Sequence, residues 1–169
     1  VMGGVFYLVY ASGIGISAVW AAGLMSGREL VGVLLRFFFG RLAERFGALL
    51  LLVLSVIIGA TALIFMPQVQ SLVGLAAIAL VIGVSGACVP PALNLMVGGT
   101  AAREEQSFAI LCLATGHFCV QTLTAPLVGV MVGAWGYDVS YPALGFVWIA
   151  LALVVLRVGR GVLRRQAEQ

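Results

Sequence analysis

The stretch Gly40-Arg41-Leu42-Ala43-Glu44-Arg45-Phe46-Gly47 decides how this chain folds. Charged residues and glycines fall together here, between two long apolar runs that begin near Ala18 and at Ala48. Each run has the length needed to cross a bilayer, because a hydrocarbon core of about 30 Å takes about 20 residues of helix. We therefore predict that residues 40–47 form a tight turn between two membrane-spanning helices.

The composition places the whole chain in a membrane. Of its 169 residues, 63% are hydrophobic and 9% are charged, whereas a soluble domain carries about 25% charged residues. The apolar runs are unbroken rather than alternating, so they predict helices and not the strands of a membrane barrel. The predicted fold class is all-α, a polytopic membrane helix bundle, and the lipid bilayer is its first partner.

We divide the chain into six spans within a single transmembrane domain, residues 1–169. The spans are predicted at residues 1–12, 18–42, 48–66, 72–97, 106–133 and 142–158. A dozen helical residues reach only ~18 Å, so we expect the first span to be truncated; the alternative is one span from Gly3 to Ala22. Ser17 is the expected N-cap of the second span. Residues 135–141 are expected to form a turn with interfacial aromatic residues.

The basic residues predict the orientation. All nine are arginines. If each span crosses the membrane once, seven of them fall on the same side of it: Arg41, Arg45, Arg103, Arg157, Arg160, Arg164 and Arg165. The opposite turns, near Gly13, Gln68 and Asp138, hold no lysine or arginine. The positive-inside rule therefore predicts a cytoplasmic C-terminus, in the plasma membrane or bacterial inner membrane. The basic residues are not interleaved with aromatic residues, so nucleic-acid binding is not expected.

Three charged residues lie inside the second span, where an arginine costs about 2.5–3.5 kcal/mol. Arg28 and Glu29 can partly neutralise each other. Glu29 and Arg36 share a helix face about 10 Å apart, too far for contact but able to line one water-filled cavity. We expect all three in a substrate or ion pathway. Alternatively, Arg36 reaches the cytoplasmic headgroups, and with a full-length first span Arg28 and Glu29 lie at the outer surface.

Polar residues in two further spans are weaker candidates. His117, Gln121 and Thr124 share one face of the fifth span, where an imidazole can relay protons or bond a neighbouring helix. Asn94 follows Pro90-Pro91 by one turn, which predicts either a bent span lining a cavity or a kink needed only for packing. A lone histidine and three separate cysteines predict no metal site, and no cofactor is expected.

An enzymatic alternative comes from Gly83-Val84-Ser85-Gly86. With His117 it resembles the Ser/His pair of rhomboid intramembrane proteases, in which a serine nucleophile needs a base within hydrogen-bond reach. The Trp-Arg loop and the His-x-x-x-Asn pattern of that family are missing. We keep this as a remote alternative and predict no catalytic residues and no enzyme.

Residues 40–47 also resemble the loop motif of the major facilitator superfamily, Gly-x-x-x-Asp/Glu-Arg/Lys-x-Gly followed by two basic residues. Gly40, Glu44, Arg45 and Gly47 fit this motif. The residues that replace the closing basic pair are Ala48 and Leu49, a degeneracy similar to the copy in the second half of these transporters. Arg36-x-x-x-Gly40 is similar to the Gly-Arg-x-x-x-Gly run that precedes this motif in many bacterial members, with Leu35 in place of its glycine. Three other segments resemble parts of that same half: Gly13–Ser17, Gly86–Leu93 and Ala125–Gly129.

The resemblance covers nearly the whole chain but only half of a family member. It implies the C-terminal six-helix half of a secondary transporter, whose partner is a missing N-terminal half or a second copy. The implied function is transmembrane transport of a small-molecule substrate by alternating access, as a permease or efflux protein, with ion coupling. Glu44 and Arg45 would hold one end state by charge contacts. The alternative is a non-transporting six-helix membrane protein that assembles with a partner half or with itself.

Overall fold

The computed structural model describes residues 7, 10, 11, 13, 15–100 and 104–167. Throughout these residues the chain is helical apart from short connections, which confirms the all-α class. The elements are α2 (Ala18–Phe46), α3 (Ala48–Phe65), a short 3-10 turn η1 (Met66–Gln68), α4 (Leu72–Thr100), α5 (Gln106–Trp135) and α6 (Tyr137–Ala167). The four helices from α2 to α5 begin at the residues that the sequence predicts.

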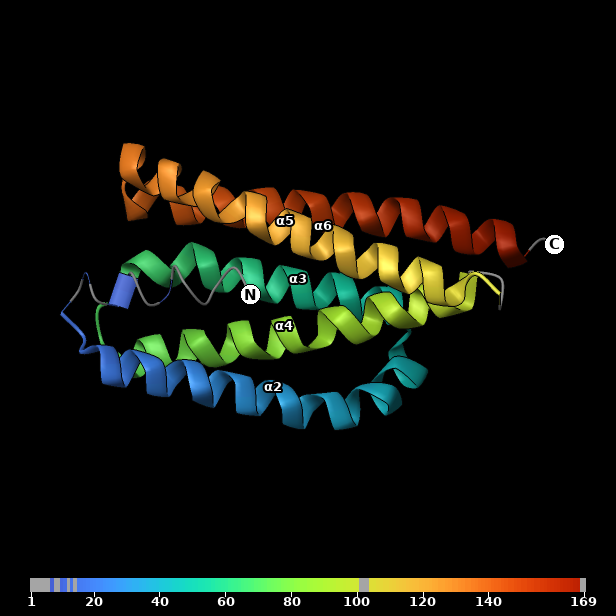
Figure 1. Cartoon of the computed structure of the whole chain (residues 1–169), viewed down its shortest axis with the longest axis horizontal. Helices are drawn as coiled ribbons and strands as arrows, with labels where there is room; N and C mark the ends of the chain where they lie inside the picture. The colour runs from blue at the N-terminus through green and yellow to red at the C-terminus, as the bar shows by residue number, and fades with distance from the viewer. Residues whose placement is uncertain (1–6, 8–9, 12, 14, 101–103, 168–169) are drawn as a thin grey trace.

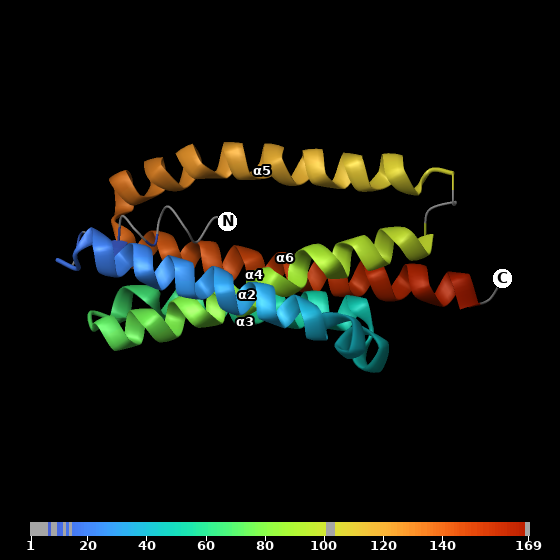
Figure 2. The ribbon, with the colours of Figure 1, turned by 60° about the horizontal axis from the view of Figure 1, so that its bottom comes forward.

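The long helices run antiparallel to their neighbours in the chain (Figure 1). α3 packs against both α4 and α6, and α2 packs along α4. α5 lies apart from the other four, as Figure 2 shows, and is the least covered of the five. The α2–α3 junction, the end of α4, the start of α5 and the end of α6 lie at one end of the bundle (Figure 1). That end carries Arg41 and Arg45 of α2 and the C-terminal part of α6, whereas Arg103, on which the predicted orientation also depends, falls outside the described residues.

Five helices in the described part of the chain are long and apolar enough to cross a membrane. The sequence predicts six, and the first of these, residues 1–12, falls mostly outside the described residues. Gly15, Ile16 and Ser17 are not helical, and Gly15 has a φ of 83°. A continuous span from Gly3 to Ala22 is therefore not formed. Ser17 holds the N-cap position of α2, but its side chain makes no capping hydrogen bond.

The predicted turn at residues 40–47 is wrong in extent. α2 continues to Phe46, and α3 begins only two residues later, at Ala48. Leucine, alanine, glutamate and arginine all favour helix, so charge alone does not end it. The break is Gly47, whose φ of 83° suits a glycine. Its N–H donates to the carbonyl oxygen of Ala43 at 2.8 Å, which closes the last turn of α2.

The predicted turn at residues 135–141 is also shorter in the structure. Only Gly136, with a φ of 75°, separates α5 from α6, and residues 137–141 are already helical. Pro142 lies inside α6 rather than at its start. At its other end α6 continues past residue 158 to Ala167. Arginine, leucine, glutamine and alanine favour helix there, so the helix outlasts the apolar stretch.

Tyrosines close the end of the bundle opposite the arginines. The Tyr10 hydroxyl donates to the carbonyl oxygens of Pro67 (3.0 Å) and Val69 (3.2 Å), in the connection between α3 and α4. The Tyr7 hydroxyl donates to the carbonyl oxygen of Leu75 at 3.1 Å. A buried tyrosine adds apolar contact area and satisfies a polar group at its tip. These bonds attach the first segment of the chain to the α3–α4 connection.

Candidate functional site

A cavity of about 290 Å³ lies among the five long helices and takes lining residues from each of them. Most of its lining is aliphatic, glycine or proline. The ionisable groups in that lining come from two helices: Arg28, Glu29 and Arg36 from α2, and His117 from α5. The cavity therefore combines a small charged set with an apolar wall inside a membrane bundle.

Arg28 is the buried member of this set, with 7% of its surface exposed. Its side chain lies against Gly83 of α4. A Cβ atom built on Gly83 would stand 2.5 Å from the Arg28 Cγ atom and 3.0 Å from the Arg28 carbonyl oxygen. Any larger residue at position 83 would push α2 and α4 apart. The absence of a side chain at Gly83 therefore provides the space that Arg28 occupies.

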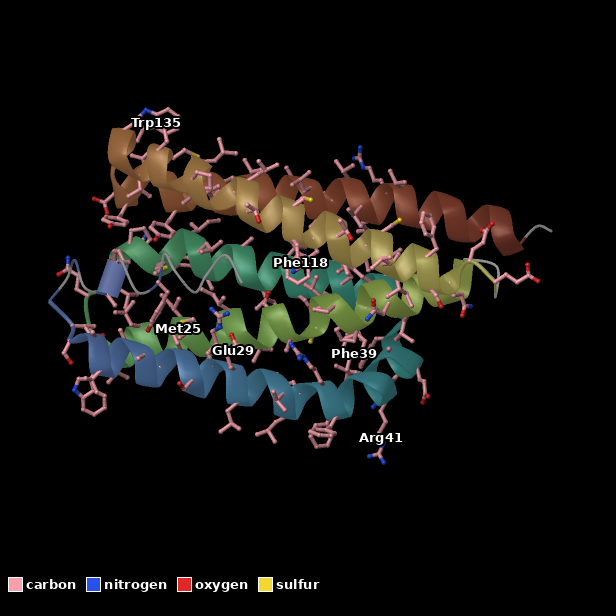
Figure 3. The ribbon with its side chains drawn as sticks, in the orientation of Figure 1. Met25, Glu29, Phe39, Arg41, Phe118 and Trp135 are labelled. Atoms are coloured by element: carbon pink, nitrogen blue, oxygen red, sulfur yellow. The ribbon has the colours of Figure 1, made fainter. Side chains whose placement is uncertain are left out.

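Glu29 is the counterion of Arg28. The Arg28 Nη2 atom donates to the Glu29 Oε1 atom at 2.9 Å. The Glu29 side chain is 62% exposed and projects from α2 toward the middle of the bundle, whereas Arg41 points away from it (Figure 3). The mutual neutralisation expected of Arg28 and Glu29 is thus present as an ion pair.

Arg36 lies two turns further along α2 and lines the same cavity. Its side chain is exposed, and among the described residues it has no ion-pair partner. Glu29 and Arg36 therefore border one cavity without touching, as their spacing predicts. Their role in a substrate or ion pathway stays a prediction.

Of the other predicted polar residues whose side chains the structure describes, one lies at the cavity. His117 lines it, with its ring centroid 6.2 Å from that of Phe118. The Thr124 hydroxyl donates within α5, to the Val120 carbonyl oxygen at 2.6 Å. Asn94 is exposed on α4, one turn beyond Pro90, and is not part of the lining. The side chain of Gln121 lies outside what the structure describes.

Ser85 lines the cavity but is engaged elsewhere. Its hydroxyl donates to the carbonyl oxygen of Ser55 on α3 at 2.6 Å, and 8% of the residue is exposed. A nucleophilic serine has to give its hydroxyl proton to a base. Here that proton is donated to a backbone carbonyl oxygen. The geometry therefore favours a structural role for Ser85, a hydrogen bond between α4 and α3, over the role of a protease nucleophile. Nor do the described residues contain a group of three or more His, Cys, Asp or Glu that could hold a metal ion.

The loop-motif residues lie at the arginine end of the bundle. Gly40, Glu44 and Arg45 are on the last turns of α2 and are exposed, and Gly47 makes the break before α3. The Arg45 guanidinium carbon lies 5.6 Å from the ring centroid of Phe46. Within the described residues neither Glu44 nor Arg45 forms an ion pair, so their charges remain exposed at this end.

Sequence reasoning missed two kinds of lining residue. From the sequence, Gly83 is identified only as part of the Gly-x-Ser-Gly pattern and Trp148 of α6 is not identified, yet both line the cavity. A glycine that seats an arginine from another helix has no local signal, because the partner is far away in sequence. Trp148 lies in an apolar run where any large residue would satisfy the pattern, so no signal could have placed it in the cavity.

The comparison with known families agrees with this arrangement. The family model described as Major Facilitator Superfamily matches the chain over residues 1–169. No curated protein matches the chain. The match extends over every helix that lines the cavity.

Proposed function

Because the chain belongs to the major facilitator superfamily, whose members are membrane transporters and not enzymes, we propose that it moves a small solute across the membrane by alternating access. It is an integral, multi-pass membrane protein, as its family and its five apolar helices agree. In alternating access one cavity opens in turn to each side of the membrane as parts of the protein rock around a fixed site.

The observation that carries this proposal is the charged cavity itself. Ionisable residues at membrane depth are costly and face cavities or partners rather than lipid. Here four of them border about 290 Å³ of space, close to the lower limit of about 300 Å³ for ligand pockets. We assign Arg36, Arg28 and Glu29 to the solute pathway. Glu29 and His117 are the titratable candidates for ion coupling.

The proposed orientation puts the arginine end of the bundle in the cytoplasm. Arg41 and Arg45 at the end of α2, and the C-terminal part of α6, lie at that end (Figure 1). Positive charge is retained on the cytoplasmic side of membrane proteins. This supports a cytoplasmic C-terminus in a plasma or bacterial inner membrane.

We further propose that this bundle works against a second half, either an N-terminal six-helix half or another copy of the chain. α2 and α5 both expose large apolar side chains, among them Leu30, Phe37, Leu111 and Leu123. Lipid covers part of this surface in the proposed assembly and the second half covers the rest. Glu44 and Arg45, exposed and without an ion pair in the described structure, would then be available to contact the partner half in one end state.

Labelling from each side of the membrane tests alternating access without a known substrate. In the natural protein with all its cysteines replaced by alanine, Cys88, Cys112 and Cys119 among them, Val120→Cys places a thiol in the cavity. The control is Leu123→Cys on the same helix, which is 65% exposed but does not line the cavity. The impermeant, anionic thiol reagent MTSES is applied to right-side-out and to inside-out vesicles.

The expected result is that Val120→Cys reacts from both sides and Leu123→Cys from neither, because lipid or the second half covers Leu123. Reaction of Val120→Cys from one side only, or from neither, would contradict alternating access. That outcome would instead support the second candidate, a non-transporting membrane protein that assembles with a partner half or with itself. The same vesicles show which side Arg41→Cys faces, and reaction there only from the outside would refute the proposed orientation.

A further inference from the structure

We infer that the solute is a small organic monoanion with an apolar body, and that Arg36 holds its charged group. The inference rests on the proposed transport function and specifies the chemical class that this cavity accepts. It follows from the charge balance of the lining and from the character of the remaining wall.

The charge balance comes from the ionisable groups that the described residues of this chain bring to the cavity lining. α2 supplies Arg28, Glu29 and Arg36, α5 supplies His117, and the lining residues from α3, α4 and α6 are not ionisable. The charges of Arg28 and Glu29 cancel in an ion pair of 2.9 Å. Arg36 has no ion-pair partner in the described structure. The cavity is therefore left with one positive charge when His117 is neutral, and with more when it is protonated.

The uncompensated positive charge of Arg36 determines which charge the solute should carry. A monoanion neutralises Arg36, and a guanidinium can bind both oxygens of a carboxylate in a fork. A neutral solute leaves the arginine unpaired at membrane depth. A cation adds to the repulsion, and a dianion leaves a second negative charge beside Glu29. The singly charged anion is the class that leaves the cavity closest to neutral.

The rest of the wall selects the body of the solute. Most of the lining is apolar, including Val56, Leu63, Ile82, Val120 and Trp148. Such a wall offers a carbon skeleton contact but few hydrogen bonds, so a polyhydroxylated body would lose its water without compensation. At about 290 Å³, the cavity suits a small aromatic or branched carboxylate.

Trp148 supplies a test that does not depend on transport. This chain has three tryptophans; Trp20 and Trp135 are 62% and 61% exposed. Both are replaced by phenylalanine, together with any tryptophan that the natural protein carries outside residues 1–169, so that Trp148 is the single reporter. Fluorescence of the purified natural protein with these changes is quenched with iodide, a monoanion, and with caesium, a monocation. A positive cavity concentrates iodide and excludes caesium, so iodide should quench Trp148 several-fold more strongly than caesium when each is divided by its quenching of free N-acetyltryptophanamide.

Variants assign this preference to Arg36. Arg36→Gln should reduce iodide quenching to the level of caesium, and Arg36→Lys should retain the preference. Glu29→Gln, which releases the charge of Arg28, should increase it. The matched control is Arg41→Gln, on the same helix but directed away from the bundle (Figure 3), and it should change nothing. Benzoate should protect Trp148 from iodide, whereas neutral benzamide of the same shape should not.

Equal quenching by iodide and caesium, or an iodide preference that survives Arg36→Gln, would overturn the inference. Protection by benzamide as strong as by benzoate would overturn it as well. These failures leave two-sided labelling of Val120→Cys untouched, so they refute the anion class and not transport. The converse result, a charge-selective cavity with one-sided labelling, refutes transport and leaves the anion site.

Discussion

The Nη2 atom of Arg28 lies 2.9 Å from the Oε1 atom of Glu29, an ion pair between neighbours in the chain. Adjacent residues on a helix do not face each other, so these two side chains meet by bending toward one another. The two members differ in environment, because the Arg28 side chain is 8% exposed and that of Glu29 is 62% exposed. A buried cation is thus neutralised by a carboxylate at the edge of the cavity.

The first prediction concerns this pair. Glu29→Gln should lower the free energy of unfolding by about 1–3 kcal/mol, because it leaves a buried guanidinium without its counterion. The measurement is thermal unfolding of the natural protein in detergent. Glu44→Gln is the matched control, since Glu44 lies on the same helix, is exposed and has no ion pair in the described structure.

A double variant separates charge from packing. Arg28→Gln with Glu29→Gln removes both charges, so its cost should be smaller than the sum of the two single changes. An additive double variant, or an equal effect of Glu44→Gln, would show that the pair does not stabilise α2.

The second prediction concerns the glycine beneath Arg28. Gly83→Ala places a Cβ atom 3.0 Å from the backbone carbonyl oxygen of Arg28, and a backbone atom cannot swing aside. We expect a loss of about 1–3 kcal/mol from overpacking. Gly86→Ala, on the same helix, meets no atom within 4 Å and should instead stabilise by up to about 1 kcal/mol through helix propensity. Melting curves that fall by the same amount for both variants would contradict this difference.

The third prediction concerns the contact between α3 and α4. A Cβ atom on Gly59 would overlap the Ser85 hydroxyl oxygen, which is held by its bond to the Ser55 carbonyl oxygen. Gly59→Ala should therefore destabilise the bundle by about 1–3 kcal/mol. In a Ser85→Ala background the obstructing oxygen is gone, so the same change should cost less. Equal losses in the two backgrounds, measured by unfolding, would show that this oxygen is not the obstacle.

The membrane class and the starts of α2 to α5 follow from the sequence because they depend on local composition, whereas α6 begins at Tyr137, before the predicted Pro142. Long apolar runs predict helices, and the beginnings of α2 to α5 coincide with changes in polarity that any reading of the chain detects. The ends were less accurate at Phe46 and Ala167, because a helix in favourable residues continues past the apolar stretch until a residue such as Gly47 breaks it. Polarity reports where the membrane ends, not where the helix ends.

The site was only partly predictable for a different reason. The spacing of Glu29 and Arg36 places both on one face, which one helix determines alone. The contact of Arg28 with Gly83 depends on the packing of α2 against α4. The position of Trp148 in the same cavity depends on a third helix, α6. Pairings between helices have no periodicity in the sequence, so they emerge only when the bundle is assembled.

The fourth prediction concerns the end of the bundle where Tyr10 meets the α3–α4 connection. Tyr10→Phe keeps the ring but removes the hydroxyl that donates to the carbonyl oxygens of Pro67 and Val69, so we expect a loss of about 1 kcal/mol. Backbone amides of residues 66–71 should exchange hydrogen faster, since the connection is less firmly held. The matched control is Tyr137→Phe, whose ring stacks on Tyr141 at 5.8 Å and whose hydroxyl has no hydrogen bond in the described structure. If exchange at residues 66–71 is unchanged in Tyr10→Phe, or rises equally in Tyr137→Phe, the Tyr10 hydroxyl does not hold this connection closed.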